Sequence, residues 1–381
     1  MDTTQFRPRE IERRFSSRLH EPRTAALLGI ALGVTITICF MTGLLSHAAQ
    51  HPTAWFGWPA RPAGLYRVTQ AVHTLTGVVT IPILLAKLWV VFPKLFEWPP
   101  VRSAAHGLER LSILPLIAGG LFMMLSGVAN LARWYPWSFS FTSAHYAVAW
   151  ITFGSLVIHL GTKWTIVRGS IGPATPADVD VALPGARRAF LGGVAATSGL
   201  AFLATAGNTI SPLSKFAALA QRRPGVGPQG VPVNKSAKGA GVLDKIGDPA
   251  WTLEISGRVA STVRLSLADL SGMTQRSAVL PIACVEGWSS SATWTGVPIG
   301  DLLARAGVIG DAEVSVESVQ EGGGYRRSDL NAGEVADPDT LLALRLNGQP
   351  LDLDHGYPMR LIGPNRPGVM QTKWVNRLVV R

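Results

Sequence analysis

Five long runs of apolar residues occupy the first half of the chain, and each is long enough to cross a lipid bilayer. They extend roughly over Ala25–Ser46, Val68–Val91, Leu111–Ala132, Ala144–Ile166 and Ala189–Ile210. A crossing takes about 20 apolar residues, and each of these runs carries at most one charged residue. We therefore predict an all-α transmembrane bundle of five helices.

After Ile210 the pattern changes to short alternating runs separated by turns. A Pro/Gly-rich linker covers Gln221–Gly230. One short helix is expected at about Ile299–Ala306, after a proline, and the strand-like runs are Trp251–Val259, Thr262–Leu267, Glu313–Val319, Leu341–Leu346 and Val375–Val380. A mixed α+β domain of about 150 residues is large enough to form its own core.

These patterns predict a multi-domain chain in five parts. A basic tail (1–24) precedes a four-helix membrane domain (25–170). The fifth helix lies in a linker (171–211), and a Pro/Gly linker (212–230) leads to the α+β domain (231–381).

Charge is distributed unevenly along the 381 residues. The net charge is +11, and residues 1–224 carry 20 Lys and Arg against 8 Asp and Glu. The excess lies on short segments between uncharged runs, which is typical of membrane topology rather than of nucleic-acid binding. No nucleic-acid partner is expected.

The basic residues also predict the orientation of the helices. The tail, the second loop and the fourth loop carry 12 Lys and Arg, whereas the first and third loops carry 3, namely Arg61, Arg67 and Arg133. Because basic flanks stay in the cytoplasm, the N-terminus is predicted inside and the C-terminal half outside the plasma (inner) membrane. The outer loops supply interfacial aromatics: Trp55, Phe56, Trp58, Tyr66, Trp134, Tyr135 and Trp137.

The fifth run follows a pair of arginines. Arg187 and Arg188 precede a Gly/Ala-rich apolar stretch, an arrangement that resembles an internal twin-arginine translocation signal. The pair is equally consistent with an ordinary basic flank on the cytoplasmic side. Because no alanine-type cleavage site follows, the segment is expected to remain as an anchor.

Histidines within the apolar runs are candidate haem ligands. His145 and His159 are 14 residues apart, so they lie about 40° apart on one helix face and about 21 Å apart along its axis. By depth, His73 matches His145 on the outer side, with His47 as the second choice, and His106 matches His159 on the inner side. Such spacing resembles di-haem b-type cytochromes and predicts one or two b haems. The alternative is that these side chains only form hydrogen bonds within the bundle.

Of the two cysteines, Cys39 lies in an apolar run and Cys284 lies in the second half. A lone cysteine in an exported domain is either buried and inert or used as a thiolate, which is a soft ligand suited to redox metals.

Three motifs occur around and after Cys284: CVEGWS at 284–289, TWTGVPI at 293–299 and HGYPMRL at 355–361. Together they resemble the molybdopterin domain of the sulfite oxidase family, most closely its bacterial branch with the periplasmic methionine-sulfoxide reductase catalytic subunit. The resemblance covers about residues 228–381, and the helical half resembles cytochrome b-type domains more loosely.

The resemblance implies molybdenum held by one molybdopterin and by the Cys284 thiolate, cycling between Mo(VI) and Mo(IV). Asn234, His355, Arg360 and Lys373 match positions that contact the pterin and its phosphate, a role that suits cationic side chains. Tyr325, after three glycines, is a further residue expected near the pocket.

The implied function is a membrane-bound molybdopterin oxidoreductase for oxygen-atom or two-electron transfer. Its electrons would pass through b haem to a quinone or redox partner, and its substrate would be a small molecule or a protein sulfoxide. Two alternatives stay open: the helices are a haem-free anchor, or the domain is a non-catalytic binding protein that retains the fold.

Overall fold

The structure is a computed structural model, and it describes residues 17, 19–53, 57–96, 101–171, 184–308 and 310–381. Most of the predicted basic tail, the aromatics Trp55 and Phe56, and residues 172–183 of the predicted linker lie outside this description. The chain divides into two compact units. The helical unit comprises Met1–Gly43 and Val72–Thr205, and the sheet unit comprises Leu44–Ala71 and Ala206–Arg381.

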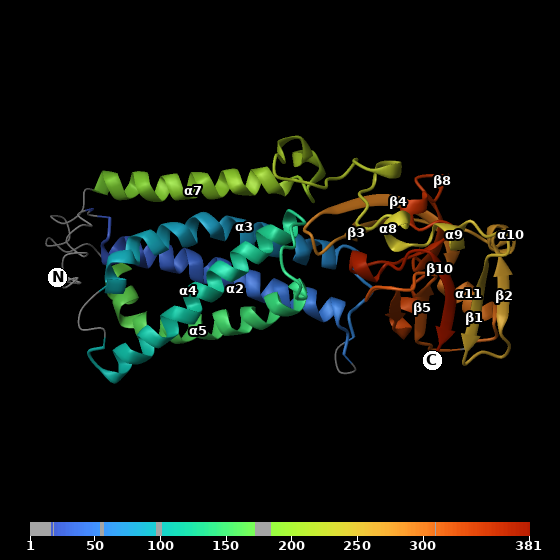
Figure 1. The fold of residues 1–381 in the computed structure, drawn as a ribbon, viewed down its shortest axis with the longest axis horizontal. Coiled ribbons are helices and arrows are strands. Elements are labelled where there is room, and N and C mark those ends of the chain that lie inside the picture. The colour runs from blue at the N-terminus through green and yellow to red at the C-terminus, as the bar shows by residue number, and fades with distance from the viewer. Residues whose placement is uncertain (1–16, 18, 54–56, 97–100, 172–183, 309) are drawn as a thin grey trace, which may run out of the picture. The chain divides into compact units, whose positions relative to one another are not determined.

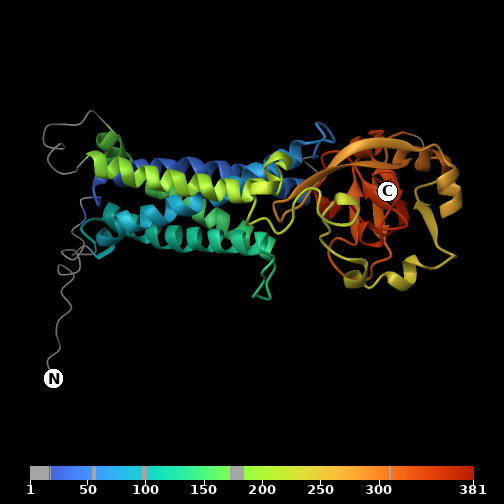
Figure 2. The ribbon, with the colours of Figure 1, turned by 90° about the horizontal axis from the view of Figure 1, so that it is seen from above.

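Among the described residues, five helices are long and apolar enough to cross a membrane, which confirms this part of the prediction. They are α2 (Pro22–Gln50), α3 (Leu65–Val91), α4 (Ala104–Leu131), α5 (Phe141–Ile171) and α7 (Pro184–Ala206). Within the helical unit, α2, α3, α4 and α5 run lengthwise beside one another (Figures 1 and 2). A 3₁₀ turn, η1 (Phe92–Phe96), follows α3.

The fifth helix ends earlier than predicted, at Ala206 rather than Ile210. The chain folds back at Gly207, where an added Cβ would lie 2.5 Å from the backbone oxygen of Leu213. The returning segment is η2 (Ser211–Phe216). The predicted end at Ile210 included Gly207, Asn208 and Thr209, which lie beyond the last apolar turn of the helix.

Two five-stranded sheets form the frame of the sheet unit. The first has the order β2-β1-β10-β5-β6, and the second has the order β3-β4-β7-β8 with β9 also paired to β7. Only β1 and β10 are parallel among these pairs. The strands are β1 (Thr252–Gly257), β2 (Val263–Ser266), β3 (Arg276–Ala283), β4 (Ser289–Pro298), β5 (Val314–Ser318), β6 (Arg327–Leu330), β7 (Leu341–Leu346), β8 (Gln349–Pro350), β9 (Arg360–Ile362) and β10 (Val375–Val380).

Short helices and turns connect the strands. They are η3 (Pro228–Gly230), α8 (Ala237–Ala240), α9 (Leu243–Ile246), α10 (Leu267–Gly272), α11 (Ile299–Arg305), α12 (Ala332–Ala336), η4 (Leu353–His355) and η5 (Gly368–Met370). The α+β architecture agrees with the prediction. The five predicted strands correspond to β1, β2, β5, β7 and β10, and the predicted helix is α11.

Two apolar clusters hold the strands together. The larger joins Leu253 of β1 and Leu378 of β10 to Leu302 of α11. The second surrounds Trp294 of β4 and includes Cys284 and Trp288. Burying this apolar surface stabilises the frame around the turn that carries Cys284.

Candidate functional site

Five of the six residues singled out in the sheet unit line one cleft, namely Asn234, Cys284, His355, Arg360 and Lys373. Its space, including the open mouth, is about 270 Å³. The lining residues are Pro232, Val233, Asn234, Ile282, Cys284, Trp288, His355, Arg360, Gly368 and Lys373. Strand ends and turns from distant parts of the sequence therefore converge here.

Cys284 sits in a tight turn directly after β3. The Cys284 N–H donates to the Trp288 carbonyl (2.9 Å), and the Gly287 N–H donates to the Cys284 carbonyl (3.0 Å). Gly287 has φ 85°, a conformation that glycine adopts without strain. Only 2% of Cys284 is exposed. Burial, with a smaller contribution from Glu286, raises the pKa of the thiol to about 12, so a metal must displace a proton to bind it.

Glu286 fixes the outer side of this turn. It forms an ion pair with Arg222 and accepts a hydrogen bond from Trp288 Nε1 (3.0 Å). Arg222 also donates to the Asn234 carbonyl (3.3 Å). Arg222, in the linker before the sheets, therefore connects this linker to the Cys284 turn through Glu286.

Arg360, on β9, is a buried cation on the cleft wall. It donates to the carbonyls of His355 (3.2 Å) and Gln371 (3.1 Å), and its guanidinium lies 5.3 Å from the Trp294 ring centroid. Its Nε has no hydrogen-bond partner among the described residues. Burial lowers the pKa of Arg360 to about 9.

His355 and Lys373 add a polar and a cationic group to the cleft wall. His355 Nε2 lies 2.8 Å from the Pro228 carbonyl, which can only accept, so Nε2 carries the proton. Burial and then Arg360 lower the pKa of His355 to about 4. Lys373 Nζ donates to the carbonyls of Lys235 and Asp354. Burial and then Arg360 lower its pKa to about 7.

This set fits a phosphate-bearing cofactor with a metal ligated by sulfur. Arg360 and Lys373 donate to neutral carbonyls, Arg360 Nε has no partner among the described residues, and no ion pair joins either side chain to a described carboxylate. Two buried cations without a counter-anion are costly, and a bound phosphate would supply that charge. Cys284 offers the soft ligand at the same cleft.

The sequence interpretation missed two aromatic supports of this site, Trp288 and Trp294. Both tryptophans occur inside the quoted motifs. The sequence shows the motifs, but it does not show that these tryptophans pack around the site. Tyr325 is half-exposed, and burial followed by the nearby Cys284 raises its pKa. Tyr325 is not among the residues that line the cleft, so its role at the pocket stays a prediction.

In the helical unit the structure brings His73 of α3 and His145 of α5 together. Their ring centroids are 6.3 Å apart and the rings are nearly perpendicular. His73 Nδ1 lies 2.9 Å from the Cys39 carbonyl, and His145 Nδ1 lies 2.9 Å from Ser126 Oγ. With both Nδ1 atoms engaged, Nε2 of each ring is the atom left for a metal.

The spacing of the two rings suits a shared metal ion. Metal–nitrogen bonds of about 2 Å on opposite sides of one ion put two imidazole centroids about 6 Å apart. An added Cβ at Gly43 would lie only 3.0 Å from His73 Cε1, so a side chain there would displace the ring.

The other histidines are placed differently. His106 lies in the first turn of α4, where its Nδ1 accepts from the Arg102 N–H (3.1 Å). His159 Nδ1 is buried without a partner among the described residues. No ring contact between His106 and His159 occurs in the described part of the chain. His47 instead contacts His51, with centroids 4.4 Å apart.

Comparison with known proteins identifies the sheet-containing part. Residues 240–381 match the family model of the oxidoreductase molybdopterin-binding domain. This segment is therefore similar to molybdopterin-binding oxidoreductase domains. The match confirms the predicted type of domain and supports molybdenum-molybdopterin as its cofactor.

Among relatives, the chain is similar to the protein-methionine-sulfoxide reductase catalytic subunit MsrP of Xanthomonas campestris. They are 33% identical over 136 residues, 32% of this chain and 42% of MsrP. The nitrate reductase [NAD(P)H] of Hordeum vulgare is 30% identical over 169 residues, 37% of this chain and 19% of the relative.

A third relative is the putative protein-methionine-sulfoxide reductase subunit YedZ1 of Azospira oryzae. It is 30% identical over 136 residues, 34% of this chain and 49% of the relative. The chain therefore spans less than half the length of each of these relatives.

Proposed function

We propose that this chain is a membrane-bound molybdopterin-dependent oxidoreductase. The observation that carries the proposal is the cleft of the molybdopterin-binding domain, where the Cys284 thiol lies with Arg360, Lys373, His355 and Asn234. When bound, the cofactor supplies two-electron and oxygen-atom transfer chemistry.

The protein's residues bind and orient the cofactor. Cys284 would hold molybdenum as a thiolate, after the loss of its proton. Arg360 and Lys373 neutralise the phosphate, while His355 and Asn234 offer directional polar groups to the pterin. The cleft excludes water from the metal side, because Cys284 and Trp288 are 2% and 4% exposed.

The molybdenum site is tested by exchanging each cysteine for serine in the full chain. We expect Cys284→Ser to lose nearly all bound molybdenum, because a hydroxyl is a poor replacement for the soft thiolate. Cys39→Ser, which removes the other thiol, should keep about one molybdenum per chain. The measurement is elemental analysis after expression in a cofactor-competent host. Wild-type protein without molybdenum would favour the non-catalytic alternative, and a loaded Cys284→Ser variant would remove Cys284 from the metal.

We also propose that His73 and His145 hold a b haem through Nε2. The 6.3 Å ring separation and the engaged Nδ1 atoms support this assignment. Single electrons would pass between this haem and a quinone or another redox partner. A second haem on His106 and His159 stays a prediction.

The haem assignment is tested by three alanine variants. We expect His73→Ala and His145→Ala each to abolish the reduced-minus-oxidised b-type spectrum of the outer haem, because each variant removes a side chain that would hold the iron. His47→Ala, the second-choice ligand, should keep it. Wild-type protein with molybdenum but without iron would instead support the haem-free anchor.

For the substrate, we propose a sulfoxide, free or within a protein, by analogy with the name of the relative MsrP. Sulfite oxidation is disfavoured, because the run after Cys284 differs from that of the eukaryotic sulfite oxidases. Methionine sulfoxide and sulfite should be compared as substrates of the molybdenum-loaded protein. Turnover of sulfite alone would contradict the assignment.

We further propose that the five helices cross the plasma (inner) membrane, with the N-terminus in the cytoplasm and the molybdopterin domain outside. Helix length and composition and the distribution of basic residues support this location.

A further inference from the structure

The compact unit that holds the cleft includes residues from the helical half of the sequence. Leu44–Ala71, which spans the end of α2 and the start of α3, belongs to the sheet unit. Within it, residues 57–70 contact the molybdopterin-binding domain, and we refer to them as the docking segment.

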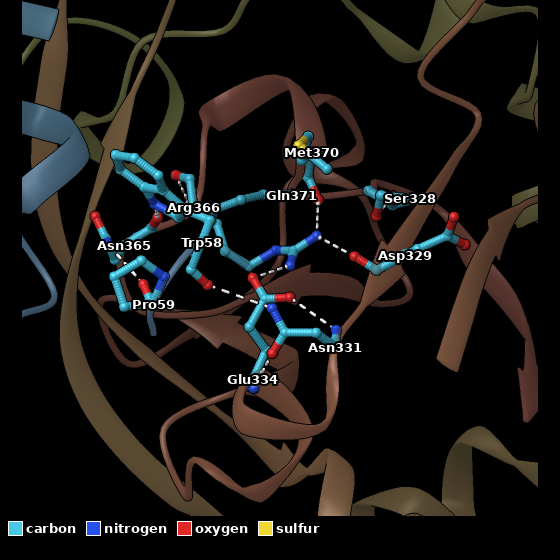
Figure 3. Close-up of polar contacts among 11 residues, drawn as sticks. Trp58, Pro59, Ser328, Asp329, Asn331, Glu334, Asn365, Arg366, Met370 and Gln371 are labelled. Atoms are coloured by element: carbon cyan, nitrogen blue, oxygen red, sulfur yellow. Dashed lines mark hydrogen bonds and ion pairs between the residues drawn. The ribbon is translucent and has the colours of Figure 1, made fainter. Parts of the chain in front are cut away.

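One residue, Asn365, binds the docking segment with all four of its polar groups. Its N–H donates to the Ala63 carbonyl (2.9 Å), and its carbonyl accepts from Trp58 Nε1 (2.9 Å). Its side chain donates to the Pro59 carbonyl (2.6 Å) and accepts from the Tyr66 N–H (2.6 Å). Figure 3 shows Asn365 facing Trp58 and Pro59. Because Asn365 is 2% exposed, these bonds lie away from water, where each lost partner is costly.

The neighbouring Arg366 fixes this turn to the domain. It forms a buried ion pair with Glu334 and donates to the carbonyls of Asp329 (3.1 Å) and Met370 (3.2 Å), as Figure 3 shows. Glu334 also accepts from the Asn331 N–H (3.0 Å), and Asn331 Nδ2 donates to the Trp58 carbonyl (3.3 Å). The docking segment is therefore held by a network whose polar groups are largely satisfied.

The docking segment lies directly against the residues that carry Cys284. Trp58 and Tyr66 form an apolar cluster with Ala283, the residue before Cys284. Gln70 Nε2 donates to the Val285 carbonyl, the residue after it, at 3.4 Å. Arg67 donates to Ser291 Oγ (3.0 Å) just beyond the turn.

The turn that contains Asn365 also contacts Ala283. Pro367 forms a bridge with Ala283, and an added Cβ at Gly368, a cleft residue, would lie 2.8 Å from the Ala283 carbonyl. Ala283 is thus enclosed between the docking segment and the turn that binds it.

We infer that the docking segment positions the Cys284 turn, with Asn365 and Gln70 as positioning residues. The inference rests on the proposed function in assigning Cys284 to molybdenum. The thiol is held in the cleft by residues that come from between the first two long helices. The sheets therefore provide only part of the support of the site. Supporting contacts of this kind fix the orientation of a metal ligand.

The test compares two asparagines that both adopt the left-handed backbone conformation. Asn365 has φ 54° and Asn347 has φ 49°. Asn347 also makes two side-chain bonds, accepting from the Thr293 N–H (3.0 Å) and donating to the Gln229 carbonyl (2.9 Å). Glycine at either position keeps the backbone conformation and removes only the side chain.

Hydrogen–deuterium exchange of residues 283–289 and alkylation of Cys284, followed by peptide mass spectrometry, are measured on the cofactor-free full chain. We expect Asn365→Gly to accelerate both by roughly tenfold, because the turn loses its support. Asn347→Gly should leave both unchanged. Equal exchange in the two variants would overturn the inference.

If Asn365→Gly does not fold, Gln70→Leu provides the second measurement. It removes the hydrogen bond to the Val285 carbonyl, together with the one that Gln70 Oε1 accepts from Ser46 Oγ (2.7 Å), at similar side-chain volume. It should accelerate exchange of the same peptide by a few-fold. An unchanged peptide in Gln70→Leu would again reject the positioning role.

The outcome is separable from that of the proposed function. Exchange and alkylation are read without cofactor, whereas the metal assignment depends on the molybdenum content of Cys284→Ser. In loaded protein, Asn365→Gly should retain molybdenum, change the Mo(V) resonance and lower kcat more than it changes KM.

Discussion

At the scale of single residues, a motif residue predicts a binding site only in combination with the other motif residues, and the cleft shows why. Arg360 and His355 each suit a surface strand or a turn when read alone. In the structure Arg360 lies on β9 and donates to the carbonyl of His355, five residues earlier, so both reach one cleft. The sequence predicts these residue types and their order. It cannot show their burial, which depends on strands from distant positions.

Burial of cations predicts a pH dependence of the empty domain. The pKa of Lys373 is lowered from 10.5 to about 7, so the unfolded chain binds more protons than the folded one between these values. Stability of the cofactor-free protein should therefore rise as the pH increases from about 7 to 10. Lys373→Met should raise Tm at pH 7 by roughly 2–4 °C, which is about 1 kcal/mol for a domain of this size.

Differential scanning fluorimetry with inorganic pyrophosphate checks the same group. The anion should raise Tm of wild-type protein more at pH 6.5 than at pH 9, and it should have less effect on Lys373→Met. Lys238→Met, which removes an exposed lysine, serves as the matched control. A pH-independent Tm in wild-type protein would show that Lys373 is not a buried cation.

At the scale of elements, the sequence predicted β1, β2, β5, β7 and β10, whose apolar pattern is regular, whereas β3, β4, β6, β8 and β9 were not among the predicted strands. β3 contains Pro281 near its end, and proline weakens a strand signal. β4 begins with three serines, of which two are buried by neighbouring structure. Their pairing over the full length of β3 arises from tertiary contacts that local propensity does not encode.

Close packing of β4 on β7 predicts that Gly296 tolerates no side chain. An added Cβ would lie 2.0 Å from the Leu342 carbonyl oxygen and 2.5 Å from Ala343 Cα, both backbone atoms. Gly296→Ala must separate the strands, and we expect a loss of about 1–3 kcal/mol in unfolding free energy.

Gly300→Ala is the matched control, because there the nearest atom would be the Val335 carbonyl oxygen at 3.7 Å. Denaturant unfolding of the full chain, followed by exchange of the β4 peptide, compares the two variants. Equal stability of both would show that the strand pair relaxes at little cost.

At the scale of the whole molecule, the helices and the fold class were predictable, but the docking segment was not. The apolar runs encode the helices directly, since length and hydropathy decide them. Trp58 and Asn365 are 307 residues apart, and nothing in the local pattern of either indicates their contact. The residue pattern therefore indicated a linear arrangement of domains, whereas the compact sheet unit combines two separate stretches of chain.

The same arrangement bears on export of the domain. Cys284 and Arg360 are 2% and 5% exposed, so we expect the cofactor to enter before folding is complete and the folded domain to cross the membrane afterwards. A translocation route that accepts folded domains is the one that twin-arginine signals address. Arg187 and Arg188 lie in the first turns of α7, where Arg187 also pairs with Glu21 at 2.8 Å.

Exchanging Arg187 and Arg188 for lysine distinguishes a twin-arginine signal from an ordinary basic flank, because lysine keeps the positive charge but not the arginine pair. We expect Arg187→Lys with Arg188→Lys to leave the domain on the cytoplasmic side, measured by its resistance to protease added outside intact spheroplasts. The adjacent pair Arg326 and Arg327, changed to lysine in the same way, should be exported normally. Normal export of both variants would reject the signal, since positive charge alone orients a helix and lysine supplies it equally.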